Sequence, residues 1–247
     1  MRWVEWERVE TGCTDAVVRR SADGRAYAKT ATSPASRAEL ADERDRATWL
    51  AGTGIPGPRV LDWDDSTLVT STVAGVPASS LGPGDGVRVV PALAEALVEL
   101  HGLGPADCPF DRTLAVTLPA AVRNATDGLV DANDFDAERH GRSAADLLAE
   151  VQARRPWTED LVVCHGDACL PNVLVDPDAL TVSGWVDLGR LGVADRHWDL
   201  ALLTRSMGDN ALNPGFGPEA AVALLAAYSV VADPDLLDFY RLLDEFF

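Results

Sequence analysis

A dense group of polar residues follows an apolar stretch in the second half of the chain. The sequence reads His165-Gly-Asp-Ala-Cys-Leu-Pro-Asn172 after the apolar run Leu161–Val163, and Asp187 lies fifteen residues beyond Asn172, after a second apolar run. Carboxylate and amide oxygens are the ligands that Mg²⁺ prefers in proteins, and a carboxylate that holds no metal can orient a hydroxyl group. The spacing therefore favours metal-assisted chemistry at strand ends, although each residue alone also suits a turn or a cap.

Short strands and one helix are expected in the first 75 residues. Apolar residues alternate in four short runs, and a turn sequence joins the first two. A serine before a proline and a Ser-x-x-Glu pattern mark the start of one helix, and two glycines mark its end. The first two expected strands are Asp15–Arg20 and Arg25–Thr30, with a turn at Ser21–Gly24. The expected helix opens at Ser33-Pro34, has a capping box at Ser36 and Glu39, and ends at Gly52 and Gly54. Two further strands are expected over Pro58–Trp63 and Thr67–Thr72, followed by a connector at Ala74–Pro77.

The remainder of the chain is predicted to be mainly helical, with one strand-rich interruption. Apolar residues recur at helical spacing in three stretches. The expected helices lie within residues 87–103, 143–153 and 217–230, and the expected strands are Leu161–His165, Val173–Val175 and Thr181–Val186. This order fits an α+β fold with a cleft between two lobes, a small sheet-and-helix lobe over residues 1–75 and a larger, mostly helical lobe over residues 76–247.

Charge is distributed unevenly along the chain, whose formal net charge is −18. Residues 1–80 carry 12 acidic and 10 basic side chains, whereas residues 81–247 carry 27 acidic and 11 basic ones. Non-specific nucleic-acid binding needs clustered Lys and Arg and is therefore excluded. An acidic surface attracts cationic ligands by electrostatic focusing. The acidic run Asp127–Glu138 belongs either to such a binding surface or to a solvated loop.

Neither a membrane segment nor a secretion signal is expected. No stretch approaches 18 consecutive apolar residues, and the start, Met1–Glu5, turns acidic at once. The four cysteines form no C-x-x-C pair and have no metal-like spacing with histidine. Reduced thiols in a cytoplasmic protein without a membrane or protein partner are the expectation.

The polar group and Asp187 together resemble the catalytic segments of the protein-kinase-like fold. Kinases carry His-Arg-Asp, four further residues and Asn, and later Asp-Phe-Gly. Here Gly166 replaces the arginine and Leu188 replaces the phenylalanine. The resemblance implies two lobes, a small antiparallel-sheet N-terminal lobe with one main helix and a larger helical C-terminal lobe. It also implies that Asp167 orients the acceptor hydroxyl and that Asn172 and Asp187 hold Mg²⁺.

A kinase also needs a lysine on a strand, paired with a glutamate on the next helix. Lys29 ends a predicted strand and is the one lysine among 21 basic residues. Lysine is a compact point charge suited to phosphates, whereas arginine is a broad planar fork. Glu43 shares the apolar face of the helix, where an unpaired carboxylate is costly, so it is preferred over Glu39, which the capping box explains. The other residues expected at the nucleotide, with ATP as donor and GTP as the alternative, are Thr14, Tyr27, Ser71 and Val73.

Several longer runs are similar to the aminoglycoside 3′-phosphotransferases. They are Gly-Trp-Val-Asp-Leu-Gly-Arg-Leu-Gly-Val-Ala-Asp at 184–195, Asp-Cys-Pro-Phe-Asp at 107–111 and Leu-Leu-Asp-Glu-Phe-Phe at 242–247. This resemblance implies transfer of the γ-phosphate of ATP to the 3′-hydroxyl of a kanamycin- or neomycin-type antibiotic, whose ammonium groups meet the acidic lobe. The residues that it places at the drug are Asp134, Asp136, Arg190, Arg205, Asp244, Glu245 and Phe247.

Two other hypotheses remain open at the level of sequence. One is another small-molecule kinase of the same fold, of the choline, homoserine or fructosamine type, with an amine-bearing acceptor. The acidic end of the chain and the run at residues 127–138 favour a polyamine over an amino acid. The other is a nucleotide-binding regulator without activity, which the intact set of Lys29, Asp167, Asn172 and Asp187 opposes.

Overall fold

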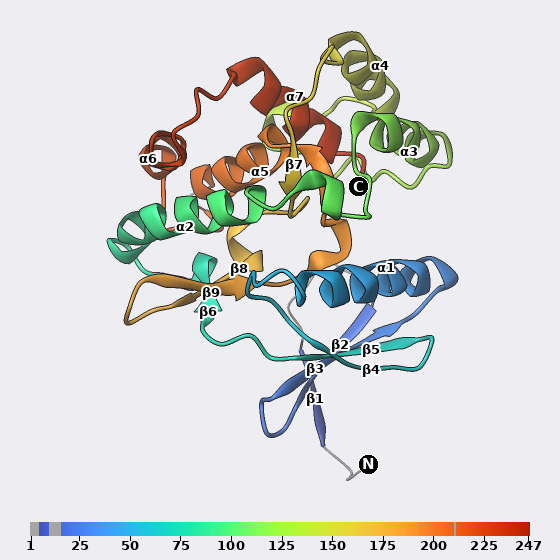
Figure 1. The fold of residues 1–247 in the computed structure, drawn as a ribbon. Coiled ribbons are helices and arrows are strands. Elements are labelled where there is room, and N and C mark those ends of the chain that lie inside the picture. Colours follow the sequence, from blue (N-terminus) through green and yellow to red (C-terminus); the bar gives the residue numbers. More distant parts are fainter. Residues whose placement is uncertain (1–4, 10–15, 210) are drawn as a thin grey trace. The chain divides into compact units, whose positions relative to one another are not determined.

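Five antiparallel strands form the first sheet, in the order β1-β2-β3-β5-β4 (Figure 1). The strands are β1 (Trp6–Arg8), β2 (Ala16–Ser21), β3 (Ala26–Ala31), β4 (Val60–Trp63) and β5 (Thr67–Ser71). This computed structural model describes residues 5–9, 16–209 and 211–247. The predicted turn between β2 and β3 is confirmed, because the Ser21 hydroxyl donates to Asp23 and Gly24 has a φ of 70°.

The helix α1 (Pro34–Leu50) follows β3 and begins differently from the prediction. The Ser33 hydroxyl accepts a hydrogen bond from the Ser36 amide, and the Ser36 hydroxyl accepts one from the Ser33 amide. The predicted capping box at Ser36 and Glu39 is therefore wrong. Pro34 suits the first helical position and places the box three residues earlier. The predicted inward face is confirmed by the buried residues Leu40, Glu43, Ala47 and Leu50.

A second sheet, in the order β6-β8-β9, joins two distant parts of the sequence. Its strands are β6 (Val76–Pro77), β8 (Val173–Asp176) and β9 (Thr181–Trp185). A β-carbon on Gly184 would lie 2.9 Å from the carbonyl oxygen of Pro56, and the Trp185 amide donates to that oxygen at 3.0 Å. Because the backbones approach so closely, and because φ is 154° here, residue 184 needs to be glycine.

The chain packs as two compact units, each discontinuous in sequence. The first comprises the chain up to Ser80 together with Pro171–Arg190, and the second comprises Leu81–Leu170 and Leu191–Phe247. The lobes expected from the sequence, residues 1–75 and 76–247, are each continuous, so they place residues 171–190 in the second lobe. Residues 171–190 join the first unit because β8 pairs with β6 and because the 3₁₀ turn Leu188–Arg190 packs on α1.

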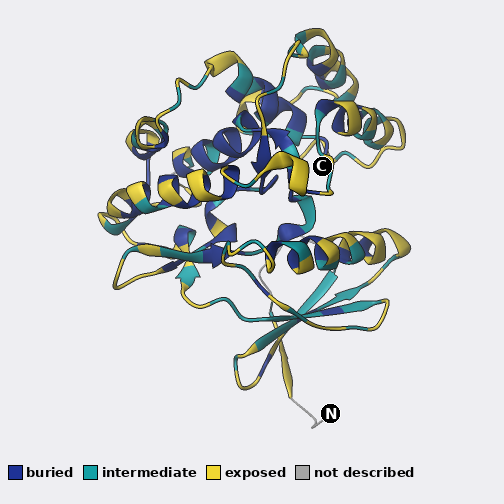
Figure 2. Cartoon of the chain, viewed as in Figure 1, coloured by how far each residue is buried: buried dark blue, intermediate teal, exposed yellow. Residues whose placement is uncertain are grey.

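Helices dominate the second unit. They are α2 (Asp85–His101), α3 (Leu114–Thr126), α4 (Ala144–Arg154), α5 (His197–Gly208), α6 (Pro218–Tyr228) and α7 (Pro234–Asp244), and the strands β7 (Leu161–Cys164) and β10 (Gly192–Asp195) pair antiparallel. The three predicted helices are confirmed as α2, α4 and α6. The helix α5 was not predicted: nine of its twelve residues are buried (Figure 2), so it lacks an amphipathic pattern.

The predicted α+β class is confirmed by an antiparallel sheet in the first unit and a mainly helical second unit. Short 3₁₀ segments connect the elements, and they are Ala78–Ser80, Pro105–Asp107, Ala137–Arg139, Leu170–Asn172 and Leu188–Arg190. None of the described helices is long and apolar enough to cross a membrane.

Candidate active site

Lys29 on β3 and Glu43 on α1 form the predicted ion pair within the first unit. The ammonium nitrogen lies 2.7 and 2.9 Å from the two carboxylate oxygens of Glu43, and it also bonds to the Asp187 carboxylate. Burial alone would lower the pKa of Lys29, but the charges of Glu43 and Asp187 raise it above its usual value. Lys29 therefore remains a cation at every physiological pH.

Asp187 and Asn172 are brought close by the second sheet. The Val186 amide donates to the backbone carbonyl of Asn172 at 3.0 Å, which places Asn172 beside the residue that precedes Asp187. Asp187 has a φ of 58°, a left-handed conformation that aspartate tolerates better than most residues. Its side chain remains 45% exposed, whereas Asn172 is buried. A carboxylate and an amide from two neighbouring segments form a donor set of hard oxygens that fits Mg²⁺.

Of the other residues predicted to contact the nucleotide, Tyr27 and Ser71 are expected at the base and Thr14 over the phosphates. Tyr27 is half-buried on β3, opposite Thr70. The Ser71 amide donates to the Arg59 carbonyl at 2.8 Å, so the sheet already uses it. Thr14 lies outside the described residues.

Asp199 of α5 holds the backbone of the loop that carries Asp167 in the second unit. Its carboxylate accepts hydrogen bonds from the His165 amide at 2.6 Å and from the Gly166 amide at 2.8 Å. The buried His165 ring accepts a bond from the Asp167 amide at 3.2 Å through Nδ1. His165 thus fixes the loop. Asp167 lies half-buried on this loop.

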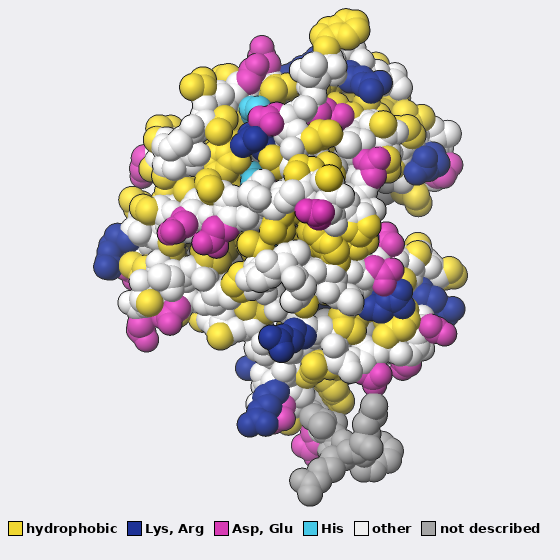
Figure 3. All heavy atoms as spheres, viewed as in Figure 1, with side chains coloured by type: hydrophobic (Ala, Val, Ile, Leu, Met, Phe, Trp, Pro, Cys, Tyr) yellow, Lys and Arg dark blue, Asp and Glu magenta, His cyan; other side chains and the backbone are white. Residues whose placement is uncertain are grey.

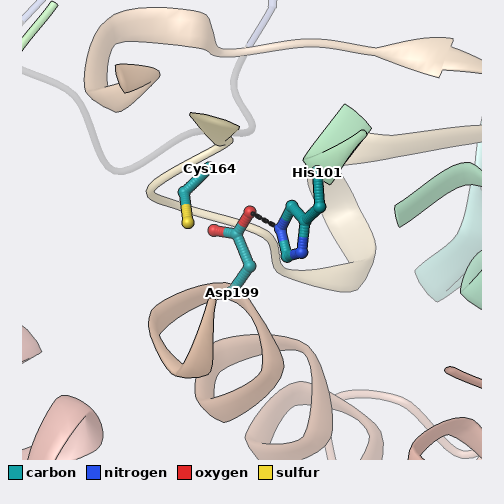
Figure 4. A group of neighbouring side chains, drawn as sticks. All are labelled: His101, Cys164 and Asp199. Carbon is teal, nitrogen blue, oxygen red and sulfur yellow. Dashed lines mark hydrogen bonds and ion pairs between the residues drawn. The ribbon is translucent and has the colours of Figure 1, made fainter. Parts of the chain in front are cut away.

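His101 at the end of α2 connects Asp199 to α6, and the sequence analysis did not single it out. His101 Nε2 donates to Asp199 at 3.0 Å (Figure 4), and Nδ1 lies 2.6 Å from the Tyr228 hydroxyl. Arg196 donates to that hydroxyl at 3.1 Å. Burial alone would raise the pKa of Asp199, but the bond and charge of His101 hold it below its usual value. A histidine at the end of an apolar helix is a weak signal, which explains why it was missed.

Cys164 completes a buried trio with His101 and Asp199, whose ligand-type atoms lie within 4.8 Å of one another. The Cys164 thiol donates to the carbonyl oxygens of Ala194 at 3.7 Å and Asp195 at 3.4 Å. Burial and the charge of Asp199 raise the pKa of Cys164 well above its usual value, which disfavours a metal-binding thiolate. The trio is therefore a hydrogen-bonded packing cluster.

Four of the residues that the resemblance places at the drug lie together in the second unit. Arg205 bonds to Asp136 at 3.2 Å and to Asp244 at 2.7 Å. Glu245 accepts a hydrogen bond from the Asp136 amide at 3.2 Å and lies 3.6 Å from Arg139. Two arginines thus offset much of the charge of three carboxylates. Figure 3 shows acidic side chains at several separate places on the visible face.

The surroundings of Glu245 change its pKa. Burial and the charge of Asp136 raise the pKa of Glu245 to about 7, although the Asp136 amide, Arg139 and Arg205 favour its charged form. Arg205 remains charged, because Asp244 and Asp136 raise its pKa despite burial. The net charge of the cluster therefore changes near neutral pH.

Of the other three residues expected at the drug, Phe247 adjoins this cluster, because its amide donates to the Asp244 carbonyl at 3.0 Å. Asp134 is exposed, and its amide donates to the Asp131 carbonyl at 3.1 Å. The Phe247 ring lies 6.1 Å from the Trp198 ring, between centroids. Arg190 ends a 3₁₀ turn and belongs to the first unit.

Comparisons with known proteins agree over almost the whole chain. Residues 5–242 match the phosphotransferase enzyme family. An aminoglycoside 3′-phosphotransferase from Streptomyces fradiae is 44% identical, and the match covers 98% of this chain and 95% of the relative. A streptomycin 3″-kinase from Streptomyces griseus is 42% identical, with 97% and 91% covered. The similarity therefore spans both compact units.

Solved structures give the same result. The crystal structure of an aminoglycoside 3′-phosphotransferase of type VIII matches with a TM-score of 0.90 and 44% identity, covering 99% of this chain and 94% of the other. The phosphotransferase APH(3″)-Id from Streptomyces rimosus, in complex with ADP and streptomycin, matches with a TM-score of 0.83 and 36% identity over 98% and 92% of the two chains. The expected fold class and the resemblance stated from the sequence are confirmed.

Proposed function

Because this chain belongs to the phosphotransferase enzyme family, we propose that it transfers the γ-phosphate of ATP to a hydroxyl group of an aminoglycoside antibiotic and so inactivates the drug. The bonded set of Lys29, Glu43 and Asp187 carries the proposal of phosphoryl transfer. The aminoglycoside as acceptor follows from the relatives. GTP is the alternative donor.

On the nucleotide side, Lys29 supplies a fixed positive charge for the α- and β-phosphates. Glu43 holds the ammonium group in place, because both of its oxygens lie within hydrogen-bond distance of Lys29. A cation held in this way neutralises phosphate charge without reorganising during the reaction. Tyr27 stacks on the base. The Val73 amide, which bonds to no other described residue, donates to the base, and Ser71 contributes through its carbonyl.

Asn172 and Asp187 would hold Mg²⁺, because their oxygens form a suitable hard donor set and their backbones are joined through Val186. When bound, Mg²⁺ neutralises charge on the phosphates. Asp187 also bonds to Lys29, so this carboxylate links the lysine to the metal site. The type of their oxygen donors and the backbone bond between Val186 and Asn172 thus support the proposed roles of Asn172 and Asp187.

On the acceptor side, Asp167 accepts the proton of the drug hydroxyl or orients that hydroxyl for attack. The role demands a carboxylate held at a defined position. Asp199 and the His165 ring together fix the backbone on both sides of Gly166. Their bonds therefore restrict where the Asp167 carboxylate can lie.

The ammonium groups of the drug are proposed to contact Asp136, Asp244, Glu245 and the carboxylate of Phe247. Arg205 bonds to two of these carboxylates, and the resemblance assigns Asp134 and Arg190 to drug binding as well. Arg205 and Arg139 already bond to these carboxylates. At the Asp136, Asp244 and Glu245 side chains a drug ammonium group therefore competes with an arginine, which makes recognition depend on geometry more than on net charge.

The 3′-hydroxyl is the first candidate acceptor, since the Streptomyces fradiae relative is a 3′-phosphotransferase at 44% identity. The 3″-hydroxyl of streptomycin is the second, because a streptomycin 3″-kinase is 42% identical. The purified chain should be given ATP and, separately, kanamycin, a 3′-deoxy aminoglycoside and streptomycin, with the phosphorylated position mapped by NMR. Phosphate on kanamycin alone supports the 3′-hydroxyl, and phosphate on streptomycin alone supports the alternative. No product with any of the three would overturn the proposed activity.

We also propose that the reaction takes place in the cytoplasm, where ATP is available. Cys108, Cys164 and Cys169 keep their thiols in the structure, as expected in a reducing compartment. The proposed activity requires no nucleic acid, membrane or protein partner.

A further inference from the structure

We propose that Arg112 is a positioning residue that clamps the ring of the C-terminal Phe247, an inference that rests on the proposed role of this terminus in drug binding. The guanidinium carbon of Arg112 lies 5.4 Å from the centre of the Trp198 ring and 5.5 Å from the centre of the Phe247 ring. The two ring centres are 6.1 Å apart. One planar cation thus lies beside two aromatic rings and is attracted to both.

Arg112 is held in place independently of Phe247. Its amide donates to the Val193 carbonyl at 2.9 Å, and the Val193 amide donates to the Phe110 carbonyl at 2.7 Å. A β-carbon on Gly192 would lie 2.7 Å from the Arg112 side chain and 2.7 Å from the Phe110 oxygen. The backbone of β10 therefore leaves just enough space for the arginine stem, and this packing fixes the base of the side chain.

The other partners of the terminus come from rigid elements. Trp198, on α5, is almost completely buried and immediately precedes Asp199. Asn124 of α3 donates to the Phe246 carbonyl at 2.8 Å, and the Phe247 amide donates to the Asp244 carbonyl at 3.0 Å. The last residues of a chain usually fray unless they are tied down. Here three separate segments of the second unit hold them.

Holding the terminus in place also positions the charged groups that are proposed to bind the drug. The same terminal turn carries Asp244 and Glu245, which bond to Arg205 and Asp136. A terminal carboxylate that is already oriented loses less conformational entropy when a drug ammonium group binds. The clamp should therefore affect affinity for the aminoglycoside and leave nucleotide binding and the chemical step unchanged.

Arginine is suited to this position in a way that lysine is not. A guanidinium group is planar and weakly hydrated, so it stacks against aromatic rings, whereas an ammonium group is a compact and strongly hydrated charge. Arg112→Lys should therefore weaken the clamp while it keeps the charge. Arg112→Met should weaken it further while it keeps most of the stem.

The test compares Arg112→Lys and Arg112→Met with the wild type and with Arg44→Met. The control is matched, because Arg44 lies 5.1 Å from the centre of the Trp63 ring in the first unit. Carboxypeptidase A, which removes C-terminal aromatic residues, should release Phe247 faster from both Arg112 variants. KM for the aminoglycoside should rise by about tenfold in Arg112→Met, with kcat and the KM for ATP unchanged.

The outcomes separate the clamp from the proposed function. Equal rates of phenylalanine release from all four proteins would overturn the clamp. Faster release with an unchanged aminoglycoside KM would overturn the positioning role, and so would an equal rise in both KM values. A wild-type chain that phosphorylates no aminoglycoside would overturn the proposed function, and the release assay would still decide whether Arg112 holds Phe247.

Discussion

Lys29 Nζ lies 2.7 and 2.9 Å from the two oxygens of Glu43, so an ion pair that is largely shielded from solvent joins β3 to α1. Asp187 bonds to the same ammonium group. Glu43 is buried on the helix, whereas Asp187 is half exposed. This difference agrees with the proposed roles, in which Glu43 holds the lysine and Asp187 belongs to the metal site.

Replacing Lys29 by arginine should lower kcat by about 100-fold. The planar guanidinium group is broader than the ammonium group and does not fit between the two carboxylates, and a small displacement of a catalytic group is costly. Steady-state kinetics with ATP and kanamycin would measure the effect. Arg44→Lys, on the exposed side of the same helix, should behave as the wild type. Wild-type rates in Lys29→Arg would show that position 29 needs only a positive charge.

Asp167→Asn should lower kcat by about 10²- to 10⁴-fold, since the amide cannot accept the proton of the drug hydroxyl. The midpoint of thermal unfolding should stay the same, because Asp199 and the His165 ring bond to the backbone amides of the loop, which the substitution leaves unchanged. Asp178→Asn, at an exposed turn, is the control. Activity near that of the control would show that Asp167 is not the catalytic base.

Glu245→Gln should change how stability depends on pH. The unfolded chain ionises this side chain near pH 4.5, whereas the folded chain keeps the proton until about pH 7. Between these pH values the unfolded state binds fewer protons than the folded state, so the wild type loses up to about 3 kcal/mol of stability as the pH rises. Glu245→Gln has no ionisable group at this position, so its stability does not fall in this way as the pH rises.

Urea unfolding at pH 5 and pH 8 would measure this difference. The free energy of unfolding should be similar for wild type and Glu245→Gln at pH 5, and it should be higher for the variant at pH 8. Glu138→Gln, an exposed neighbour, should follow the wild type at both values. Parallel pH dependence in all three proteins would contradict a raised pKa at Glu245.

Asp199→Ala should destabilise the fold by about 3 kcal/mol, because the buried His165 and Gly166 amides and the His101 ring lose their acceptor. Tyr228→Phe removes the hydroxyl that bonds to His101 and accepts from Arg196, but it leaves every bond to Asp199 in place, and it should cost about 1 kcal/mol. Denaturant unfolding would measure both changes, and kcat should fall more in Asp199→Ala than in Tyr228→Phe. Equal effects of the two variants would show that Asp199 has no special role in holding the loop.

Local features were predictable because regular spacing in the sequence becomes direct contact in the structure. The inward position of Glu43 follows from its place among Leu40, Ala47 and Leu50 on one face of α1. The turn between β2 and β3 follows from its glycine and its short polar side chains. The capping box was misplaced by three residues because only Ser36 fits the Ser-x-x-Glu pattern, whereas the observed box uses a serine, Ser36, in place of the glutamate.

By itself, the sequence determined the chemical groups and their order: the lysine, the helix glutamate, and the Asp-Asn-Asp set at strand ends. Only the tertiary structure decided what surrounds them. His101 and Asp199 are 98 residues apart and meet because α2 and α5 enclose the loop. Likewise, Arg139 and Arg205 offset the acidic cluster, and burial raises the pKa of Glu245. Burial and long-range contacts leave no periodic pattern in a sequence, because packing between distant segments produces them.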